Sequence, residues 1–483
     1  MSKPNKLTHS LDRFADILTA EDREKILDLQ KQPLPTGIRI NPLKADPATA
    51  IRDLAARYDW DVHPIPFCDN GWTIQSAGQS PGTTIEHRLG LYYLQDAASM
   101  VPVSLFDFSE PHPLVLDMAA SPGGKTTHLV DRTGDKGFIL ANDGSQGRIP
   151  ALRSVLSAWG GVNLAVTQYP GESLGGWFPE TFDRVLLDAP CSMENLRPTV
   201  NHPLRDTTID ERLRLGERQL ALLVSGLQSL KPGGLLVYAT CSLAPEEDEA
   251  VLNALLDRFP RALSVRDVSD QLPFKTPGLT QFNGQPYHAS LANALRLWPH
   301  LTGMSGFFTA LIEKQASIPT PECEKPPTRS FSRTGLVRLD DETAKQLKIV
   351  ISENYGLDLK AILNEYNLCL YERLDLIHLI PQRYLDHFRH LPYEWIGMPL
   401  GRLLADDFQP SPEFINRFGR HFKRGIIEIF GENIPQWIAG RDIRYPETDL
   451  SPEGQYLLVT DPAGRNLGLG KLLPKRLRNM LPR

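Results

Sequence analysis

The sequence predicts an α/β fold built on a mostly parallel sheet, with a smaller domain on either side of it. Between Pro113 and about Lys314, short apolar stretches that read as strands alternate with stretches that read as helices. This alternation is typical of parallel strands joined by crossover helices. A proline-rich stretch at 317–330 follows, and its composition is typical of a linker.

The N-terminal part, residues 1–105, is expected to form an α+β accessory domain. It opens with an amphipathic segment around Leu11–Leu29, which predicts a helix. The stretch TGIRINPLKAD (36–46) follows and reads as extended chain.

The central part, residues 106–316, contains five strand-like stretches and is the expected catalytic domain. They are PLVLDMA (113–119), FILAND (138–143), NLAVTQY (163–169), FDRVLLDAP (182–190) and GGLLVYATC (233–241). Apolar runs of this length with helical stretches between them predict a buried parallel sheet.

The C-terminal third divides into a linker with a helical segment, 317–373, and a β-rich domain, 374–483. A helical pattern covers Asp341–Asn367, whereas 395–404 and 454–473 show closely spaced strand and turn signals. These signals predict a small barrel. Basic side chains gather at the end of the chain and could contact phosphate or simply face solvent: Arg465, Lys471, Lys475, Arg476, Arg478 and Arg483, against the acids Glu453 and Asp461.

Composition indicates a folded, soluble protein. The chain has 483 residues, of which 41% are apolar and 23% charged, and it contains neither a signal peptide pattern nor an apolar run that could span a bilayer. We therefore expect a cytoplasmic monomer with no membrane partner. The net charge of −6 gives no global nucleic-acid signature, and the cysteines lack metal-ligand spacing: Cys68, Cys191, Cys241, Cys323 and Cys369.

A ligand-binding loop is predicted where the first central strand passes into a helix. The loop consists of Ala119, Ala120, Ser121, Pro122, Gly123, Gly124 and Lys125. Adjacent glycines let the backbone approach a ligand, and the helix start offers free N–H groups. The pattern is neither a dinucleotide loop nor a phosphate loop. Asp143 ends the second strand, where an acid commonly binds ribose hydroxyls.

Two cysteines follow the fourth and fifth strands, at the edge of the sheet where the ligand should lie. Asp188 and Cys191 lie in VLLDAPCS, and Cys241 lies in LLVYATCS. A single cysteine after a strand is usually a core residue, but two cysteines at the same edge of the sheet favour a catalytic role. A thiolate that adds to carbon 6 of cytosine makes carbon 5 able to accept a methyl group.

These motifs resemble the Sun/Nop family of RNA 5-methylcytosine methyltransferases. The resemblance rests on DMAASPGGKT, LLDAPCS and YATCSLAPEEDEAVL, in that order, and it extends from RINPLKA near Arg39 to RLWPHLTGMSGFF (296–308). It implies a Rossmann-like class I domain that binds S-adenosyl-L-methionine through residues 119–125, Asp143 and Asp188.

The resemblance also implies a role for each catalytic residue. Cys241 is implied as the nucleophile, Cys191 as the residue that helps to release the product, and Asp188 as the group at the cytosine edge, with Lys125 nearby. A DNA methyltransferase would instead place its nucleophile in the PC motif.

The C-terminal segments GMPLGRLLADDFQPSPEF and GQYLLVTDPAGRNLGLGKLLPKRLRNMLPR resemble the PUA-like RNA-binding module of RsmF-type ribosomal RNA methyltransferases. This likeness favours 16S rRNA as the partner, with tRNA second. A non-catalytic RNA-binding or ribosome-assembly factor is the alternative from another class. A metal or redox protein is disfavoured, because the cysteines lack ligand spacing and histidine partners.

The sequence departs from the family pattern at two places. Met193-Glu194-Asn195 replaces the glycine-containing stretch that normally follows PCS, and Pro170 stands where the family has an acid that approaches the adenine of the cofactor. Gln168 or Glu172 could substitute for that acid.

Overall fold

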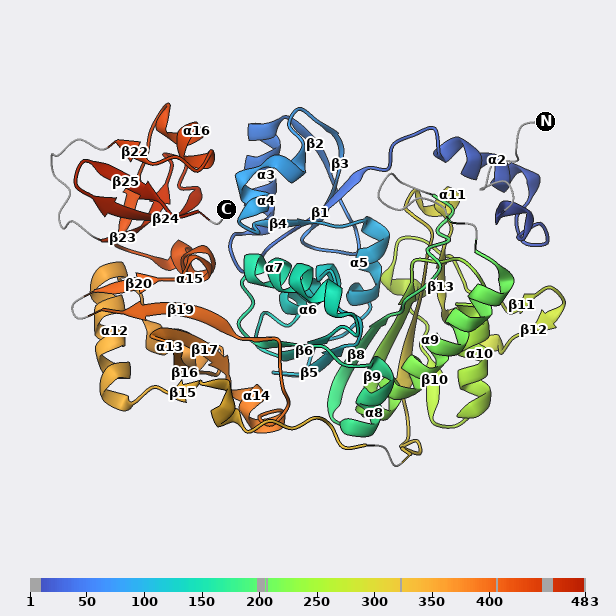
Figure 1. Ribbon diagram of the computed structural model, residues 1–483. Helices are drawn as coiled ribbons and strands as arrows, with labels where there is room; N and C mark the ends of the chain where they lie inside the picture. Colours follow the sequence, from blue (N-terminus) through green and yellow to red (C-terminus); the bar gives the residue numbers. More distant parts are fainter. Residues whose placement is uncertain are drawn as a thin grey trace.

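The computed structural model in Figure 1 describes residues 10–197, 205, 207–321, 324–404, 407–444 and 455–481. Cys323, Glu453 and Arg483 lie outside the described residues. Among the helices of the described ranges, none is long and apolar enough to cross a membrane.

All five predicted strands of the central domain form one sheet. Its parallel part has the order β9-β8-β5-β6-β7: β5 (Leu114–Asp117), β6 (Phe138–Asn142), β7 (Leu164–Thr167), β8 (Phe182–Asp188) and β9 (Leu230–Thr240). The antiparallel strand β14 (Phe307–Lys314) pairs with β9, as well as with β10 (Leu263–Val265) and β13 (Leu295–Leu297). The chain winds outward in both directions from β5, so the sheet is Rossmann-like and its switch point lies between β5 and β8.

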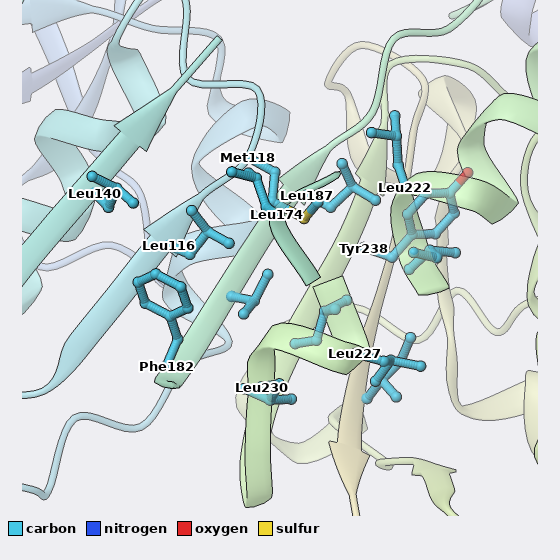
Figure 2. Packing of buried hydrophobic residues seen from close by; sticks show 14 of the residues in the cluster. Leu116, Met118, Leu140, Leu174, Phe182, Leu187, Leu222, Leu227, Leu230 and Tyr238 are labelled. Atoms are coloured by element: carbon cyan, nitrogen blue, oxygen red, sulfur yellow. The ribbon is translucent and has the colours of Figure 1, made fainter. Parts of the chain in front are cut away.

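Alternate residues of these strands pack against helices on opposite faces of the sheet. Val115 belongs to the cluster that includes Leu129 of α6 (Gly124–Arg132) and Leu152 of α7 (Ile149–Trp159). Its neighbour Leu116 belongs to the other cluster, which holds Leu222 and Leu227 of α9 (Ile209–Ser229). Figure 2 shows this second face. Because successive strand residues point to opposite sides, a strand covered on both faces must be apolar throughout.

The N-terminal domain is an antiparallel sheet with helices beside it. The strand order is β2-β3-β1-β4, with β1 (Thr36–Ile40), β2 (Trp60–Pro64), β3 (Gly71–Ala77) and β4 (Tyr92–Leu94). The helices α3 (Pro47–Tyr58), α4 (Ile85–Arg88) and α5 (Ala97–Ser104) contact this sheet. The helix α2 (Ala20–Leu29) lies apart from it and packs against α11 (Pro299–Thr302) (Figure 1). The expected helix of 11–29 is interrupted, because Thr19 caps α2 with its hydroxyl and shares a capping box with Asp22.

The C-terminal third contains two further sheets. The first joins β15 (Val337–Arg338), β16 (Leu368–Arg373), β17 (Leu376–Pro381), β19 (Met398–Leu403) and β20 (Phe408–Pro410). It lies beside α12 (Asp341–Tyr355), α13 (Leu359–Glu365) and α15 (Pro412–Phe418). Since β16 pairs with β17 along its length, the expected division at 373/374 falls inside a hairpin.

The second sheet has the order β21-β23-β24-β25-β22. Its strands are β21 (Ile426–Glu428), β22 (Ile443–Arg444), β23 (Tyr456–Thr460), β24 (Asn466–Leu473) and β25 (Arg476–Asn479), with α16 (Asn433–Ile438) packed on it. All pairs are antiparallel except β21 with β23.

The C-terminal third also completes the core of the central domain. The strand β18 (Trp395–Ile396) pairs with β7 at the edge of the central sheet. Phe388 stacks on Phe138 and Phe182, with ring centroids 5.6 and 5.7 Å apart. Truncation at 373 would therefore uncover part of the catalytic core, so it is not a clean test of RNA binding by the C-terminal domain.

Candidate active site

A cavity of about 300 Å³ lies beyond the carboxyl ends of β5, β8 and β9. Parallel sheets bind ligands at this edge, near the switch point. Several predicted residues line the cavity: Ala119, Ala120, Ser121, Pro122, Gly124, Lys125, Asp188 and Cys241. The predicted cofactor loop and the predicted nucleophile thus face one space.

The glycines of the loop are required by its geometry. Gly123 has φ +116°, a conformation that side chains disfavour. A Cβ atom on Gly124 would lie 2.7 Å from the ring of Tyr93, which belongs to the N-terminal domain. Gly123 itself does not line the cavity, and a Cβ atom on it would lie 3.0 Å from the side chain of Val155 in α7.

Arg39 fastens the N-terminal domain to the helix that follows the loop. Its buried guanidinium donates to the carbonyl of Gly124 at 3.0 Å and pairs with Asp131. The same group lies 4.7 Å from the ring of Trp159. The predicted upstream motif at Arg39 thereby holds the start of α6 in place.

Asp143 lies next to the loop but not in the cavity wall. Its carboxylate accepts the backbone N–H groups of Ser121 at 3.0 Å and Ser145 at 2.9 Å, and it is 2% exposed. In this arrangement Asp143 shapes the loop, and its direct contact with a ribose stays a prediction.

Lys125 and Asp188 form an ion pair in the cavity wall. Nζ of Lys125 donates to Oδ2 of Asp188 at 2.7 Å. Burial by itself would lower the pKa of Lys125, but the attraction of Asp188, together with Cys241 and Asp117, raises the pKa above its usual value. Lys125 is therefore a fixed positive charge close to both Asp188 and Cys241.

The two predicted cysteines are in contact. The Sγ atoms of Cys191 and Cys241 are 3.1 Å apart. The hydrogen bond with Cys241, together with burial and the negative charge of Glu247, raises the pKa of Cys191 well above its usual value. Cys191 therefore stays a neutral thiol that can donate to its partner, while Cys241 is the cysteine that reaches the cavity.

A buried carboxylate joins the two cysteine loops. Glu247 accepts the N–H of Ser192 at 2.8 Å and the hydroxyl of Ser242 at 3.0 Å, and it also accepts the hydroxyl of Ser192. Gln219 donates to it at 3.2 Å. Since Ser192 follows Cys191 and Ser242 follows Cys241, Glu247 fixes the spacing of the cysteines.

We expect Glu247→Ala to lower kcat by about 10–100-fold, because it leaves buried donors without an acceptor and releases both cysteine loops. Glu247→Gln keeps one acceptor oxygen and should lose less. Methyl-transfer rates and thermal unfolding would be measured together, with Glu246→Gln as the matched control, because Glu246 bonds Arg13 and lies outside this cluster. Equal rates for Glu247→Ala and the control would contradict the role of Glu247.

The departures from the family pattern have structural counterparts. Met193 lines the cavity and has φ +63°, the left-handed region that favours glycine. Glu194 is buried and pairs with Arg13 at 2.8 Å and with Arg212 at 2.9 Å. Glutamate at this position therefore ties the loop after Cys191 to the N-terminal segment.

Pro170 precedes a short turn and supplies no acceptor side chain. Gln168 donates to the carbonyl of Gly144 at 3.1 Å, and Glu172 pairs with Arg218 at 3.0 Å. Neither lines the cavity.

The sequence reasoning missed several residues of the site. The N-terminal domain contributes Tyr93, Gln95 and Asp96 to the cavity. Ser305, just before β14, and Phe307, the first residue of β14, also line it. Ser305 and Phe307 lie in the motif at 296–308 that ends the resemblance. The sequence indicated this motif as a whole and singled out neither residue. Nothing in the local pattern at 93–96 signalled a site, because those residues reach it through domain packing. For Glu247 the signal was the acidic run Glu246-Glu247-Asp248-Glu249, which begins five residues after Cys241.

Asp117, at the end of β5, is a buried acid whose Oδ2 accepts the hydroxyl of Thr126 at 2.7 Å. Burial raises its pKa to about 7. Between the unfolded pKa of about 3.9 and this value, the folded chain holds a proton that the unfolded chain has lost, so the stability falls as pH rises through this window.

We therefore expect the free energy of unfolding of wild type to fall between pH 5 and pH 8 by about 1–3 kcal/mol more than that of Asp117→Asn. Urea unfolding at both pH values measures this difference. An equal pH dependence in the two proteins would show that Asp117 does not titrate in this window.

Comparison with known proteins places this architecture in a family. Residues 107–313 match the model of the 16S rRNA methyltransferase RsmB/F, and residues 8–97 match the N-terminal domain of 16S rRNA methyltransferase RsmF. Ribosomal RNA small subunit methyltransferase F of Aeromonas hydrophila is 30% identical over 98% of this chain and 96% of its own. The protein of that name from Erwinia tasmaniensis is 32% identical over 96% and 93%.

Solved structures agree with this placement. A methyltransferase homologue from Pyrococcus horikoshii is 33% identical and aligns with a TM-score of 0.56, covering 65% of this chain and 99% of that one. NSun6 of the same organism is 19% identical, with a TM-score of 0.53 over 65% and 99%, and supports the fold. The chain therefore belongs to the RsmF-type family of S-adenosyl-L-methionine-dependent methyltransferases.

Proposed function

We propose that this protein forms 5-methylcytosine in RNA, with 16S rRNA as the substrate and tRNA as the second candidate. The observation that carries the proposal is the pair of thiols 3.1 Å apart at the cavity that the cofactor loop also lines. The names of the relatives support the ribosomal substrate.

The residues of the cavity suit S-adenosyl-L-methionine. The loop 119–125 offers close backbone approach and a helix start, and Asp188 with Lys125 closes the wall beside Cys241. When bound, the cofactor supplies an electrophilic methyl group. The residues that would hold it are Ala119, Ala120, Ser121, Pro122, Gly124 and Lys125. Asp143 would support the loop by accepting the N–H of Ser121.

Different residues of the chain then carry out different steps of the reaction. Sγ of Cys241, as the thiolate, forms a bond to carbon 6 of cytosine, and the electron pair of the 5,6 double bond becomes available at carbon 5. Asp188 holds the amino edge of the base, and Lys125 holds that carboxylate in place through the ion pair between them. After methylation the proton on carbon 5 passes to solvent, and the electron pair of that C–H bond re-forms the 5,6 double bond. The bond between sulfur and carbon 6 breaks, and its electron pair returns to Sγ of Cys241. Cys191 assists this release.

The proposal is tested by bisulfite sequencing of total RNA from a deletion strain and from the strain with the gene restored. We expect one cytosine of 16S rRNA to lose its modification on deletion. Loss at a tRNA cytosine instead would assign the second substrate. A complete absence of change, together with no binding of S-adenosyl-L-methionine in calorimetry, would favour the non-catalytic RNA-binding role.

We also propose that the C-terminal sheet β21–β25 is part of the PUA-like module that the sequence resemblance implies. Its mainly antiparallel pairing and its basic strand β25 support this assignment.

A further inference from the structure

Met193 lines the active-site cavity from a backbone conformation that bulky residues rarely adopt. Asp188 and Cys241 line the same cavity. The φ of Met193, +63°, lies in the left-handed region, where a side chain is disfavoured and glycine is the usual residue. Such strained positions persist only where surrounding contacts impose them, and they concentrate at functional sites. The strain at Met193 therefore needs a functional reason.

The residues that follow Met193 are held from several sides. Glu194 is buried and makes two ion pairs, and its carbonyl accepts the N–H of Leu243 at 3.0 Å. The carbonyl of Asn195 accepts the N–H of Gly306 at 2.9 Å. These bonds join the loop to the one after the proposed nucleophile and to the stretch just before β14. The position of Met193 in the cavity wall is therefore set in the free protein, before a substrate binds.

The cavity wall combines polar groups with large apolar ones. Its described polar residues include Asp188, Lys125 and Asn195, and its large apolar or aromatic side chains include Tyr93, Leu94, Met193 and Phe307. The two aromatic rings contact the loop 119–125: Nζ of Lys125 lies 5.3 Å from the centre of the Phe307 ring, and Tyr93 packs against Gly124. Met193 is the apolar side chain that comes from the loop after Cys191.

We infer that Met193 packs on the flat face of the target cytosine and holds the ring in place for attack by Cys241. An enzyme that modifies a base takes it out of its stack, and it reads the base by hydrogen bonds to the edge and by apolar contact with the flat faces. Asp188 supplies the first kind of contact in the proposed reaction. A polarisable thioether, which packs favourably on flat rings, supplies the second. The inference rests on the proposed function and adds a substrate contact to it.

The test uses substitutions that separate the side chain of Met193 from its backbone strain. Met193→Gly removes both, Met193→Ala removes the thioether but keeps a side chain at positive φ, and Met193→Leu keeps most of the apolar volume. Methyl transfer to a 16S rRNA transcript is measured in single turnovers at saturating RNA and S-adenosyl-L-methionine. We expect the Gly and Ala variants to be about 10–100-fold slower than wild type, which corresponds to the loss of one buried methionine side chain. Met193→Leu should recover most of the rate.

Two further measurements separate contact with the base from effects on folding and on cofactor binding. The melting temperature of Met193→Gly should not fall, because glycine relieves the strain. Calorimetry with S-adenosyl-L-methionine should give the wild-type affinity. Leu374→Gly is the matched control, because Leu374 also has a positive φ, +50°, but is 83% exposed in the turn between β16 and β17. This control should keep the wild-type rate.

Wild-type rates in both Met193→Gly and Met193→Ala would show that the side chain does not hold the base. A slow Met193→Gly beside an unchanged Met193→Ala would also overturn the inference, because the rigidity of the loop would then matter and not the thioether. A loss of cofactor affinity as large as the loss of rate would place Met193 against the cofactor instead. If wild type itself methylates no cytosine, the proposed reaction is wrong, and the contact with cytosine falls with it.

Discussion

Replacing the proposed nucleophile, Cys241→Ala, should abolish methyl transfer, with a loss of at least about 10³-fold in rate. Cys241 is the cysteine that lines the cavity, whereas Cys191 does not line it, although the two Sγ atoms are 3.1 Å apart. Without a thiolate at this position, carbon 5 of cytosine stays a poor nucleophile. The rate is measured by transfer of labelled methyl groups to a 16S rRNA transcript.

Two controls separate chemistry from folding. Cys369→Ala removes a thiol that hydrogen-bonds Gln382 in the C-terminal third, and it should leave the rate unchanged. Calorimetry with S-adenosyl-L-methionine should give the same affinity for Cys241→Ala and wild type. If Cys241→Ala retained methyl transfer, Cys241 would not be the nucleophile.

Cys191→Ala should instead trap the protein on its RNA. The first bond, from Cys241 to carbon 6, can still form, but the step that releases the product loses the thiol beside it. We expect an RNA–protein adduct that survives denaturing electrophoresis and accumulates to about the level of enzyme, with little turnover. Wild type should show far less of it.

The double variant Cys191→Ala/Cys241→Ala provides the matched control, since it should form no adduct at all. Should Cys241→Ala accumulate the adduct while Cys191→Ala does not, the two cysteines would have exchanged roles. Cys241 lines the cavity and Cys191 does not, which favours the first arrangement.

Much of the catalytic domain could be predicted because short stretches of the sequence specify its strands and its ligand loop. The five apolar strands and the loop 119–125 are read from short stretches, since a strand covered on both faces must be apolar and a tight ligand loop needs glycine at Gly123. The carboxyl ends of parallel strands share one edge, so the meeting of Asp188, Cys191 and Cys241 was also predictable.

The sequence by itself thus determined the sheet, the loop 119–125 at its edge and the pair of cysteines. Only the tertiary structure decided that Glu247 joins the two cysteine loops, that Tyr93 and Asp96 close the cavity from another domain, and that Phe388 completes the core of the catalytic sheet. It also placed Arg13 beside Glu194, the neighbour of Met193. These contacts join residues far apart in the chain, and their partners are fixed by packing and strand register, which no local pattern of residues encodes.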